Sequence, residues 1–338
     1  MKIAVGHEIP EVYNVQCMMA ERRKGRWFDI AVAVLATAFV ALYRILPDWA
    51  AALTIWPAWI PFAALALSPL TLIRKNAWKK PVFQSLAIGA IGLAVMDSPA
   101  SLFRSPQQAE LTVVSLNCAG GISEAMQEVA AFQPDIVLLQ ERPDAKSIQS
   151  FALELFAEDN TIIGADAAVI SRWPILKSSG APTRQNMNHA WAIVAHPKGN
   201  VAICSLRFQP PIFRLDLWSP DAWQTFTRNK TQRRKEIEEF TNALPPEFKS
   251  PDHFSIIGGD FNTPPDWTIT YPIADIGMRE TFAVHGAGLG GTAVNDYPAV
   301  RIDQIWVRGL EARGTFSVKT VHSDHRMVVA GLSIPASK

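Results

Sequence analysis

The sequence predicts an α/β domain of packed β-sheets, preceded by a helical membrane anchor. Long apolar segments occupy residues 27–96, whereas residues 111–338 alternate short strand patterns with a few helical ones. With 338 residues and 49% hydrophobic side chains, the chain can bury a large core, either as one big domain with an attachment or as two domains.

Three apolar segments predict the anchor, at residues 27–46, 50–73 and 82–96. The first two contain 20 and 24 residues, enough to cross a hydrocarbon core of ~30 Å, whereas the third contains only 15. No ionisable residue lies centrally in these segments, which argues against a channel or transporter. The anchor is therefore expected to hold the rest of the chain at a lipid bilayer.

Basic residues predict how the anchor is oriented. Residues 21–26 and 74–80 each contain four basic side chains, and the link at 47–49 contains none. Positive charge favours the cytoplasmic side, so the N-terminal segment 1–26 and the loop at 74–80 are expected there. Three crossings put the C-terminal part outside the cytoplasm. If residues 82–96 do not cross, that part lies in the cytoplasm instead.

Residues 97–110 predict a linker, and residues 111–338 a single domain. Strands are expected at 111–117, 136–140, 161–164, 167–171, 189–196, 201–208, 254–259, 302–307, 317–320 and 327–332, and helices at 123–132, 145–156 and within 221–244. Residues 1–80 carry a net charge of +5 and the whole chain +1, so residues 81–338 carry −4. This part lacks the basic surface expected of a protein that grips long nucleic acid.

The stretch IIGGDFN at residues 256–262 is the first candidate for a functional site. A buried strand ends there and presents Asp260 and Asn262. Side chains two positions apart on an extended chain point the same way, so the carboxylate and the amide converge. Because Gly, Asp and Asn are also common in turns, this stretch alone is equally compatible with a simple turn.

Other strand ends carry side chains of the same kind. Asn117 and Glu141 follow the first two strands of the domain, Asp303 opens a later strand, and Asp324 and His325 precede the last one. We therefore expect these groups to meet along one edge of the sheets. Carboxylates and amides without a Cys/His ligand set suit a hard cation such as Mg²⁺ or Mn²⁺.

Two further patterns have more than one interpretation. The basic run at 228–235 is interpreted as a solvated helix face, with a phosphate-binding patch as the alternative. Trp218, Trp223 and Trp267 are expected either to shape a rim that faces substrate or membrane, or to close the core. For Cys118 and Cys204, two buried thiols are favoured over a disulfide.

Six motifs in order resemble the endonuclease/exonuclease/phosphatase superfamily, which has the DNase I-like fold. They are LNCAGG (116–121), LLQE (138–141), VISRWPI (169–175), GGDFN (258–262), RIDQIWV (301–307) and SDH (323–325). The resemblance implies two sheets packed face to face with helices outside, a four-layer sandwich, and metal-dependent cleavage of phosphate esters at one rim. An anchor ahead of such a domain is similar to bacterial membrane members, which implies a bacterial inner membrane with the domain in the periplasm.

The resemblance implies a metal-binding group of three residues. Glu141 matches the family's principal Mg²⁺ ligand, with Asn117 beside it. Asp324 matches a carboxylate on the metal side that can also contact water.

It also implies a catalytic group of four residues. Asp260 matches the residue that orients or deprotonates the attacking water, and Asn262 one that positions phosphate or water. His325 matches a histidine that contacts the scissile phosphate, and Asp303 the residue that holds its ring. A cation, an oriented water and a His-Asp pair suffice for phosphoryl chemistry.

One position departs from the family pattern. Many members have His or Tyr in a pattern like Asn-x-His-Leu after the strand at 201–208, where this chain has Arg207. Its planar fork suits a phosphate, but its pKa excludes it as a general acid. Two interpretations therefore remain: a phosphoesterase acting on a lipid headgroup, a soluble phosphate ester or nucleic acid, and a binding or scaffold protein without turnover. No protein partner is predicted.

Overall fold

The computed structural model describes residues 11–72, 78–96, 98–180, 187–212 and 214–335, with side chains from residue 26 onwards except residue 72. The expected features at residues 1–10, 73–77 and 97 lie outside this part. The chain divides into two compact units. One consists of Met1–Ile45 and Ala58–Val95, and the other of Leu46–Pro57 and Met96–Lys338.

The first unit is helical, as its apolar sequence predicts. It contains α1 (Glu11–Ile45), α3 (Trp59–Leu67), the 3₁₀ helix η2 (Ser68–Leu72) and α4 (Lys79–Ala94). Phe62 packs among Val32, Ala36 and Ile88 in its core. Gly92 permits this packing, because an added Cβ would lie 2.5 Å from Phe62 Cβ. Within α1, Arg26–Ile45 is long and apolar enough to cross a membrane.

The expected second span at 50–73 is not one helix. The chain forms η1 (Asp48–Ala50) and α2 (Ala51–Thr54), then bends by 65° before α3. The bend includes Pro57, which lacks a backbone N–H and disfavours helical geometry at the residue before it. We call Leu46–Pro57 the corner segment. It belongs to the second unit, not to the helices on either side of it.

The second unit contains two six-stranded sheets. One has the strand order β11-β12-β1-β2-β4-β3 and the other β5-β6-β7-β8-β10-β9. The strands are β1 (Leu111–Asn117), β2 (Ile136–Gln140), β3 (Thr161–Ile163), β4 (Ala167–Ser171), β5 (Ile175–Ser178), β6 (His189–Val194), β7 (Val201–Arg207), β8 (Phe254–Asp260), β9 (Arg279–Glu280), β10 (Asp303–Arg308), β11 (Glu311–Val318) and β12 (Met327–Ser333). The pairs β1–β2 and β7–β8 are parallel, and the other paired strands run antiparallel.

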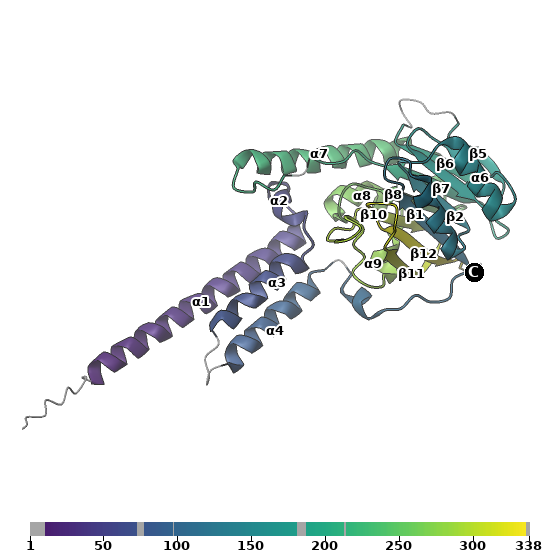
Figure 1. Cartoon of the computed structure of the whole chain (residues 1–338). Coiled ribbons are helices and arrows are strands. Elements are labelled where there is room, and N and C mark those ends of the chain that lie inside the picture. Colours follow the sequence, from purple (N-terminus) through teal and green to yellow (C-terminus); the bar gives the residue numbers. More distant parts are fainter. Residues whose placement is uncertain (1–10, 73–77, 97, 181–186, 213, 336–338) are drawn as a thin grey trace, which may run out of the picture. The chain divides into compact units, whose positions relative to one another are not determined.

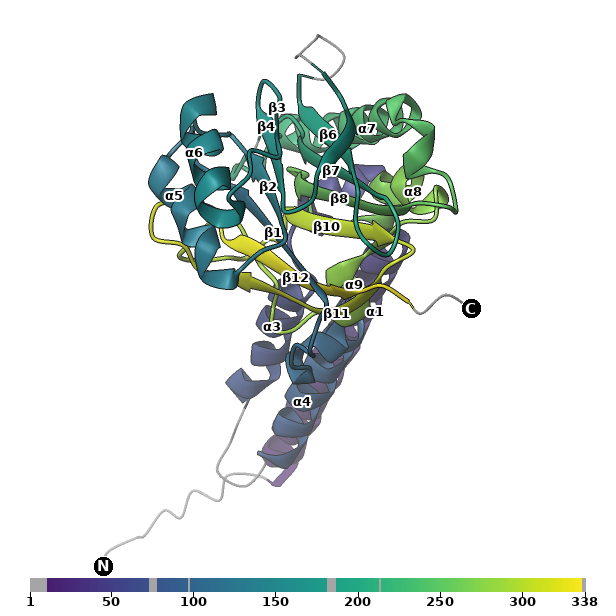
Figure 2. The same cartoon turned by 90° about the vertical axis from the view of Figure 1, so that its right-hand side faces the viewer.

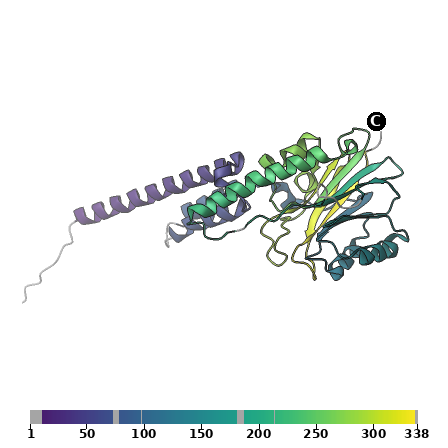
Figure 3. The ribbon, with the colours of Figure 1, turned by 90° about the horizontal axis from the view of Figure 1, so that it is seen from above.

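Helices cover the outer face of each sheet (Figures 1 and 2). They are α5 (Ser123–Gln127), η4 (Glu128–Phe132) and α6 (Ala145–Phe156) on one side, and α7 (Pro220–Ala243) and α8 (Trp267–Asp275) on the other. Figure 3 shows the sheets between these two helical layers. The predicted four-layer sandwich of the DNase I type is therefore confirmed.

Alternation along the strands produces three hydrophobic layers. In β8, Ile256 points between the sheets, where it joins Leu138, and the next residue, Ile257, points outward toward Phe240 of α7. Met126 and Phe151 fill the layer under α5 and α6. Successive side chains of a strand face opposite sides, so one apolar run serves two layers.

Elements that lack a strong apolar pattern were not predicted. These are β5, β9, the helices α8 and α9 (Thr281–His285), the 3₁₀ helices η3 (Pro99–Phe103) and η5 (Pro246–Phe248), and the first half of β11. Helix α8 contains Pro272 and begins where Asp266 accepts a hydrogen bond from Thr268 N. Part of the expected linker is bound to the domain, because the Ser101 hydroxyl donates to the Gly288 carbonyl at 2.7 Å.

Candidate active site

Strand register brings the candidate residues to one edge of the two sheets. Parallel β1 and β2 place Asn117 opposite Gln140, which directly precedes Glu141. In the other sheet β8 ends at Asp260, and antiparallel β10 begins opposite it at Asp303. Polar side chains at the ends of four strands therefore face the same region.

The segment before β12 and the end of β7 join this edge. Because β12 runs antiparallel to β1, the segment that carries His325 returns to the end of β1, where the Ser323 hydroxyl donates to the Asn117 carbonyl at 2.7 Å. Parallel β7 and β8 place Arg207 opposite Asp260. Residues that are far apart in the sequence therefore lie together at this edge.

The two glycines before Asp260 are required by close packing. A Cβ at Gly258 would lie 2.6 Å from Leu138 Cδ1, and one at Gly259 would lie 1.9 Å from the Leu206 carbonyl oxygen. Gly259 also has φ +146°, which L-residues rarely adopt. These glycines allow β8 to pack closely against β7 in its own sheet and against β2 of the other sheet. The position of Asp260 at the end of β8 is therefore fixed.

Asp260 is buried and held by amide groups. Its carboxylate accepts hydrogen bonds from Asn262 N at 2.8 Å, Asn262 Nδ2 at 3.0 Å and Asn117 Nδ2 at 3.2 Å. The Asn262 amide also donates to the Phe208 carbonyl at 2.8 Å, and its backbone has φ +49°. Asn262 therefore positions Asp260 and fixes the strand end at the same time.

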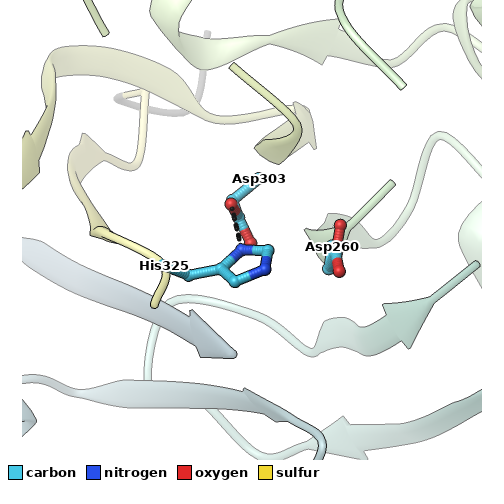
Figure 4. A group of neighbouring side chains, drawn as sticks. All are labelled: Asp260, Asp303 and His325. Carbon is cyan, nitrogen blue, oxygen red and sulfur yellow. Dashed lines mark hydrogen bonds and ion pairs between the residues drawn. The ribbon is translucent and has the colours of Figure 1, made fainter. Parts of the chain in front are cut away.

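His325 and Asp303 form the predicted pair (Figure 4). His325 Nδ1 lies 2.9 Å from Asp303 Oδ2, and the imidazole lies between Asp303 and Asp260. The Asp303 side chain is fully buried and that of His325 is 12% exposed. The second Asp303 oxygen, Oδ1, is buried and has no hydrogen-bond partner among the described residues. One ligand atom from each of Asp260, Asp303 and His325 lies within 4.8 Å of the others.

The pKa values of Asp260 and His325 are both raised, for different reasons. Burial raises the pKa of Asp260 well above its ordinary value, and the nearby Asp303 charge raises it further. Burial lowers the pKa of His325, but the charge and the hydrogen bond of Asp303 outweigh it and raise that pKa to about 10. Asp260 is thus a strong base for a carboxylate, and His325 is a cation at neutral pH.

Glu141 lies on the other side of Asn117. Gly120 N donates to Glu141 Oε2 at 2.6 Å, and Asn117 Nδ2 donates to Oε1 at 3.2 Å. The residue has φ +42°, a left-handed conformation that turns its side chain into this region. Burial would raise the pKa of Glu141, but the Asn117 hydrogen bond, the Arg207 charge and the Gly120 amide together lower it.

Arg207, the departure from the family pattern, is paired with two carboxylates. Its Nη2 lies 2.7 Å from Glu141 Oε1, and its Nη1 lies 3.0 Å from Asp166 Oδ2. Asp166 was not predicted from the sequence, because it precedes a strand of the opposite sheet and belongs to no motif. Arg207 therefore contacts the expected metal ligand directly, and its role in binding phosphate remains a prediction.

Asn117 and Asp324 are placed differently from Glu141. The Asn117 Oδ1 atom accepts a hydrogen bond from Ala119 N at 2.9 Å, so the amide directs its NH₂ group, not its oxygen, toward the carboxylates. Asp324 is exposed, and among the described residues no hydrogen bond joins its side chain to Glu141 or Asn117. It is near enough to His325 for its charge to contribute to raising the pKa of the ring.

The donor set fits a hard divalent cation. The Glu141 side chain is 25% exposed, so solvent reaches it, and Asp303 offers an oxygen without a partner. These are oxygen donors, which Mg²⁺ and Mn²⁺ prefer, and Mg²⁺ commonly uses one or two carboxylates together with water and phosphate. The arrangement combines a possible cation site, a buried base and a cationic imidazole.

The two cysteines at this end of the sheets are free thiols. Cys118 and Cys204 are both buried, and burial raises the pKa of Cys118 to about 12. The favoured expectation of two buried thiols agrees with this arrangement.

One protein family matches most of the chain. Residues 114–325 match the sequence profile of the endonuclease/exonuclease/phosphatase family. Similar structures include the beta toxin of Staphylococcus aureus with bound magnesium ions (13% identity, 65% of this chain and 99% of that chain, TM-score 0.46). A mannosyl-6-phosphatase from Bacteroides thetaiotaomicron is also similar (14% identity, 66% and 99% coverage, TM-score 0.47). So is D. rerio TDP2 with a single-strand DNA product (17% identity, 66% and 98% coverage, TM-score 0.45). No curated protein matches the chain.

Proposed function

Because the chain belongs to the endonuclease/exonuclease/phosphatase family, whose members hydrolyse phosphoester bonds, we propose that it is a metal-dependent phosphoesterase held at a membrane. The observation that carries this proposal is the cluster of Asp260, Asp303 and His325, whose ligand atoms lie within 4.8 Å of one another. Glu141 lies beyond Asn117 at the same edge.

Asp260 and Asn262 act on the water nucleophile. Asp260 is a carboxylate whose raised pKa makes it a competent acceptor for the proton of an attacking water. Asn262 and Asn117 hold that carboxylate through their amide groups, so its orientation is set before substrate binds.

His325 acts on the phosphate. As a cation held by Asp303, it offers positive charge and a hydrogen-bond donor to a phosphate oxygen. Arg207 is the second cation at this edge, and its pairing with Glu141 keeps that carboxylate in place.

When bound, Mg²⁺ or Mn²⁺ would supply charge neutralisation at the phosphate and polarisation of the ester. Glu141 is the residue proposed to hold the metal ion. Asp324 and Asn117 are the further candidates that the family pattern implies. Asp303 and Asp260 are the alternative carboxylates, because they belong with His325 to a group of described residues whose ligand atoms lie within 4.8 Å of one another.

The substrate proposed is a small or membrane-derived phosphate ester. The net charge of −4 on residues 81–338 disfavours a long nucleic acid, whose affinity depends on many basic contacts. A lipid headgroup and a soluble substrate would both present a phosphate ester to this edge of the sheets.

The proposed membrane attachment rests on α1 and on the corner segment. We call the edge of the sheets that carries Asn117, Glu141, Asp260, Asp303 and His325 the catalytic edge. It belongs to the same compact unit as the corner segment, so both are expected on the same side of a membrane. We propose that residues 58–95 leave that side and return to it, with the 16-residue α4 as the returning crossing. The basic residues at 21–26, at the start of the apolar part of α1, favour a cytoplasmic N-terminus, and hence a periplasmic catalytic unit.

Hydrolysis by the full-length protein tests the catalytic proposal. The substrates are a nitrophenyl phosphodiester, a nitrophenyl phosphomonoester, phospholipid vesicles and plasmid DNA, each with Mg²⁺, Mn²⁺ or EDTA. We expect hydrolysis that requires metal and is lost in Glu141→Gln and His325→Ala, but not in Glu154→Gln, an exposed carboxylate of α6. Hydrolysis that survives both EDTA and Glu141→Gln would contradict the proposal, and the absence of hydrolysis on every substrate would favour the binding-protein interpretation.

Labelling in sealed membrane vesicles tests the orientation. Native Cys17 precedes the proposed span, and a cysteine introduced at Leu153, an exposed residue of α6, marks the catalytic unit. A membrane-impermeant maleimide should reach one of these positions from each side. Labelling of both from the same side would refute the odd number of crossings.

A further inference from the structure

The basic run of α7 is only partly the solvated face that its sequence suggests, since Lys235 is exposed but other members are not. Lys230 and Arg233 are each only 6% exposed. Arg233 bonds to Glu236 and to the Gln209 carbonyl, and Arg234 is half-buried. These basic side chains therefore pair with other groups of the second unit, and Lys230 and Arg234 bind the corner segment.

Three side chains of α7 bind the corner segment. Lys230 Nζ donates to the Leu46 carbonyl at 2.6 Å and lies 2.8 Å from Asp266 Oδ2. Arg234 holds both carboxylate oxygens of Asp48, at 2.8 and 3.1 Å, and Thr227 donates to the Asp48 carbonyl at 3.1 Å. Backbone and side chain of the segment are thus both anchored.

This anchoring fixes where α1 can end. Leu46, whose carbonyl Lys230 holds, directly follows Ile45, the last residue of α1. Neighbouring Cα atoms lie 3.8 Å apart, so the end of the apolar helix is within one peptide of the surface of the second unit. If α1 crosses a bilayer, as proposed above, the lipid interface begins at this surface.

Exposed apolar side chains lie on the corner segment and on the chain that packs over it. Leu217 packs with Ala51, Ala52 and Phe226, whereas Leu215 and Trp218 are exposed. We call the exposed set the corner patch: Trp49 (64% exposed), Ile212 (66%), Leu215 (72%) and Trp218 (86%). Ile212 is tied to the same helix, because Asn229 Nδ2 donates to its carbonyl at 2.8 Å. Figure 1 shows α2 beside the N-terminal part of α7.

The charges beside the corner patch are balanced. Arg214 pairs with Asp216 at 2.5 Å and also with Asp221, and Arg228 lies 3.9 Å from Asp221. A surface that binds lipid through anionic headgroups carries a cluster of unpaired basic residues instead. Contact here would rest on apolar and aromatic side chains, which are favoured at the membrane interface.

We propose that the corner patch is a bilayer-contact surface, with Trp49, Ile212, Leu215 and Trp218 embedded in the lipid interface. This inference rests on the proposed membrane attachment and deepens it. The segment α2 also reaches the catalytic edge, since Ala51, Thr54 and Asn262 line one cavity of ≈ 50 Å³. Contact through the patch therefore holds the catalytic edge close to phosphate esters at the membrane surface.

Lipid quenching on the full-length protein in nanodiscs tests this surface. Single cysteines replace Ile212 and Trp218 in a Cys17→Ser background, and each carries a polarity-sensitive fluorophore. The native Cys118 and Cys204 are buried. Leu153→Cys is the exposed control on α6, and Leu35→Cys reports on α1. The quenchers are lipids with a nitroxide at the headgroup or along the acyl chain.

We expect quenching at positions 212 and 218 to be at least threefold stronger than at 153, and unchanged between zwitterionic and anionic lipid. Quenching at 35 but not at 212 and 218 would refute the corner patch while leaving the anchor in place. No quenching at 35 would refute both. Blue-shifted emission at 212 and 218 without lipid quenching would also refute it, since a protein partner or a second copy would then cover the patch. The readout uses no substrate, so loss of catalysis does not affect it.

Discussion

Replacing Asp303 by Asn removes the negative charge that does most to keep the His325 ring protonated. The substitution keeps the shape of the side chain, and the buried group can still donate or accept a hydrogen bond at the 2.9 Å contact. What it removes is the negative charge that raises the pKa of His325. Burial alone lowers that pKa, so the ring should become neutral at physiological pH.

The magnitude follows from the pKa of the ring. The difference between its ordinary value of 6.5 and about 10 corresponds to about 5 kcal/mol of preference for the charged form. The pKa of His325 is raised on folding, so this contribution to stability is complete below pH 6.5 and is lost as the pH rises through about 10. We expect Asp303→Asn to bring the pKa of the ring to 6.5 or below. The hydrolysis rate at pH 7.5 should fall by about 10²–10⁴ if the cation contacts phosphate.

Histidine NMR in EDTA measures this pKa without interference from metal. The chain has seven histidines, and His325→Gln identifies the relevant signal. Asp324→Asn is the matched control, because it removes an exposed neighbouring charge and should change the pKa of His325 much less. A ring that still titrates near 10 in Asp303→Asn would refute the reasoning about the pair.

Three further substitutions test other contacts. Gly259→Ala should distort or unfold the catalytic edge, because its Cβ would lie 1.9 Å from a backbone oxygen of β7; circular dichroism and thermal unfolding check this. Lys230→Met should destabilise the second unit by about 3–5 kcal/mol, because the buried Asp266 carboxylate loses its partner, whereas Lys235→Met on the exposed face should be nearly silent in the same unfolding assay. Arg207→Ala should tighten Mn²⁺ binding measured by electron paramagnetic resonance, because a competing cation leaves Glu141; unchanged or weaker binding would show that Arg207 does not compete.

The grouping of the candidate site residues at one edge was largely predictable because these residues lie at strand ends. The two-residue spacing of Asp260 and Asn262 reflects the alternation of a strand, and the ordered motifs identify the family. Distance in sequence limited the rest. Arg207 meets Asp166 across 41 positions and between two sheets, and no local pattern encodes such a contact.

Hydropathy alone does not separate lipid from protein at the corner segment. Ala50 and Ala52 are apolar and lie in the segment expected to cross a membrane, and both are fully buried in the structure. An apolar side chain is stable both in lipid and in a protein core, so composition does not distinguish these two environments. The basic run of α7 shows the converse, since Lys230 is buried through partners that only the folded chain supplies.

The hold of Lys230 on Leu46 also has a consequence for biogenesis. The two residues are 184 positions apart, and a ribosome adding ~5–20 residues per second needs on the order of ten to forty seconds to make the intervening chain. During that interval the corner segment has left the ribosome without its final partner. The second unit can complete its packing only after the corner segment and the much later α7 have met. These two parts of the chain therefore depend on each other to fold.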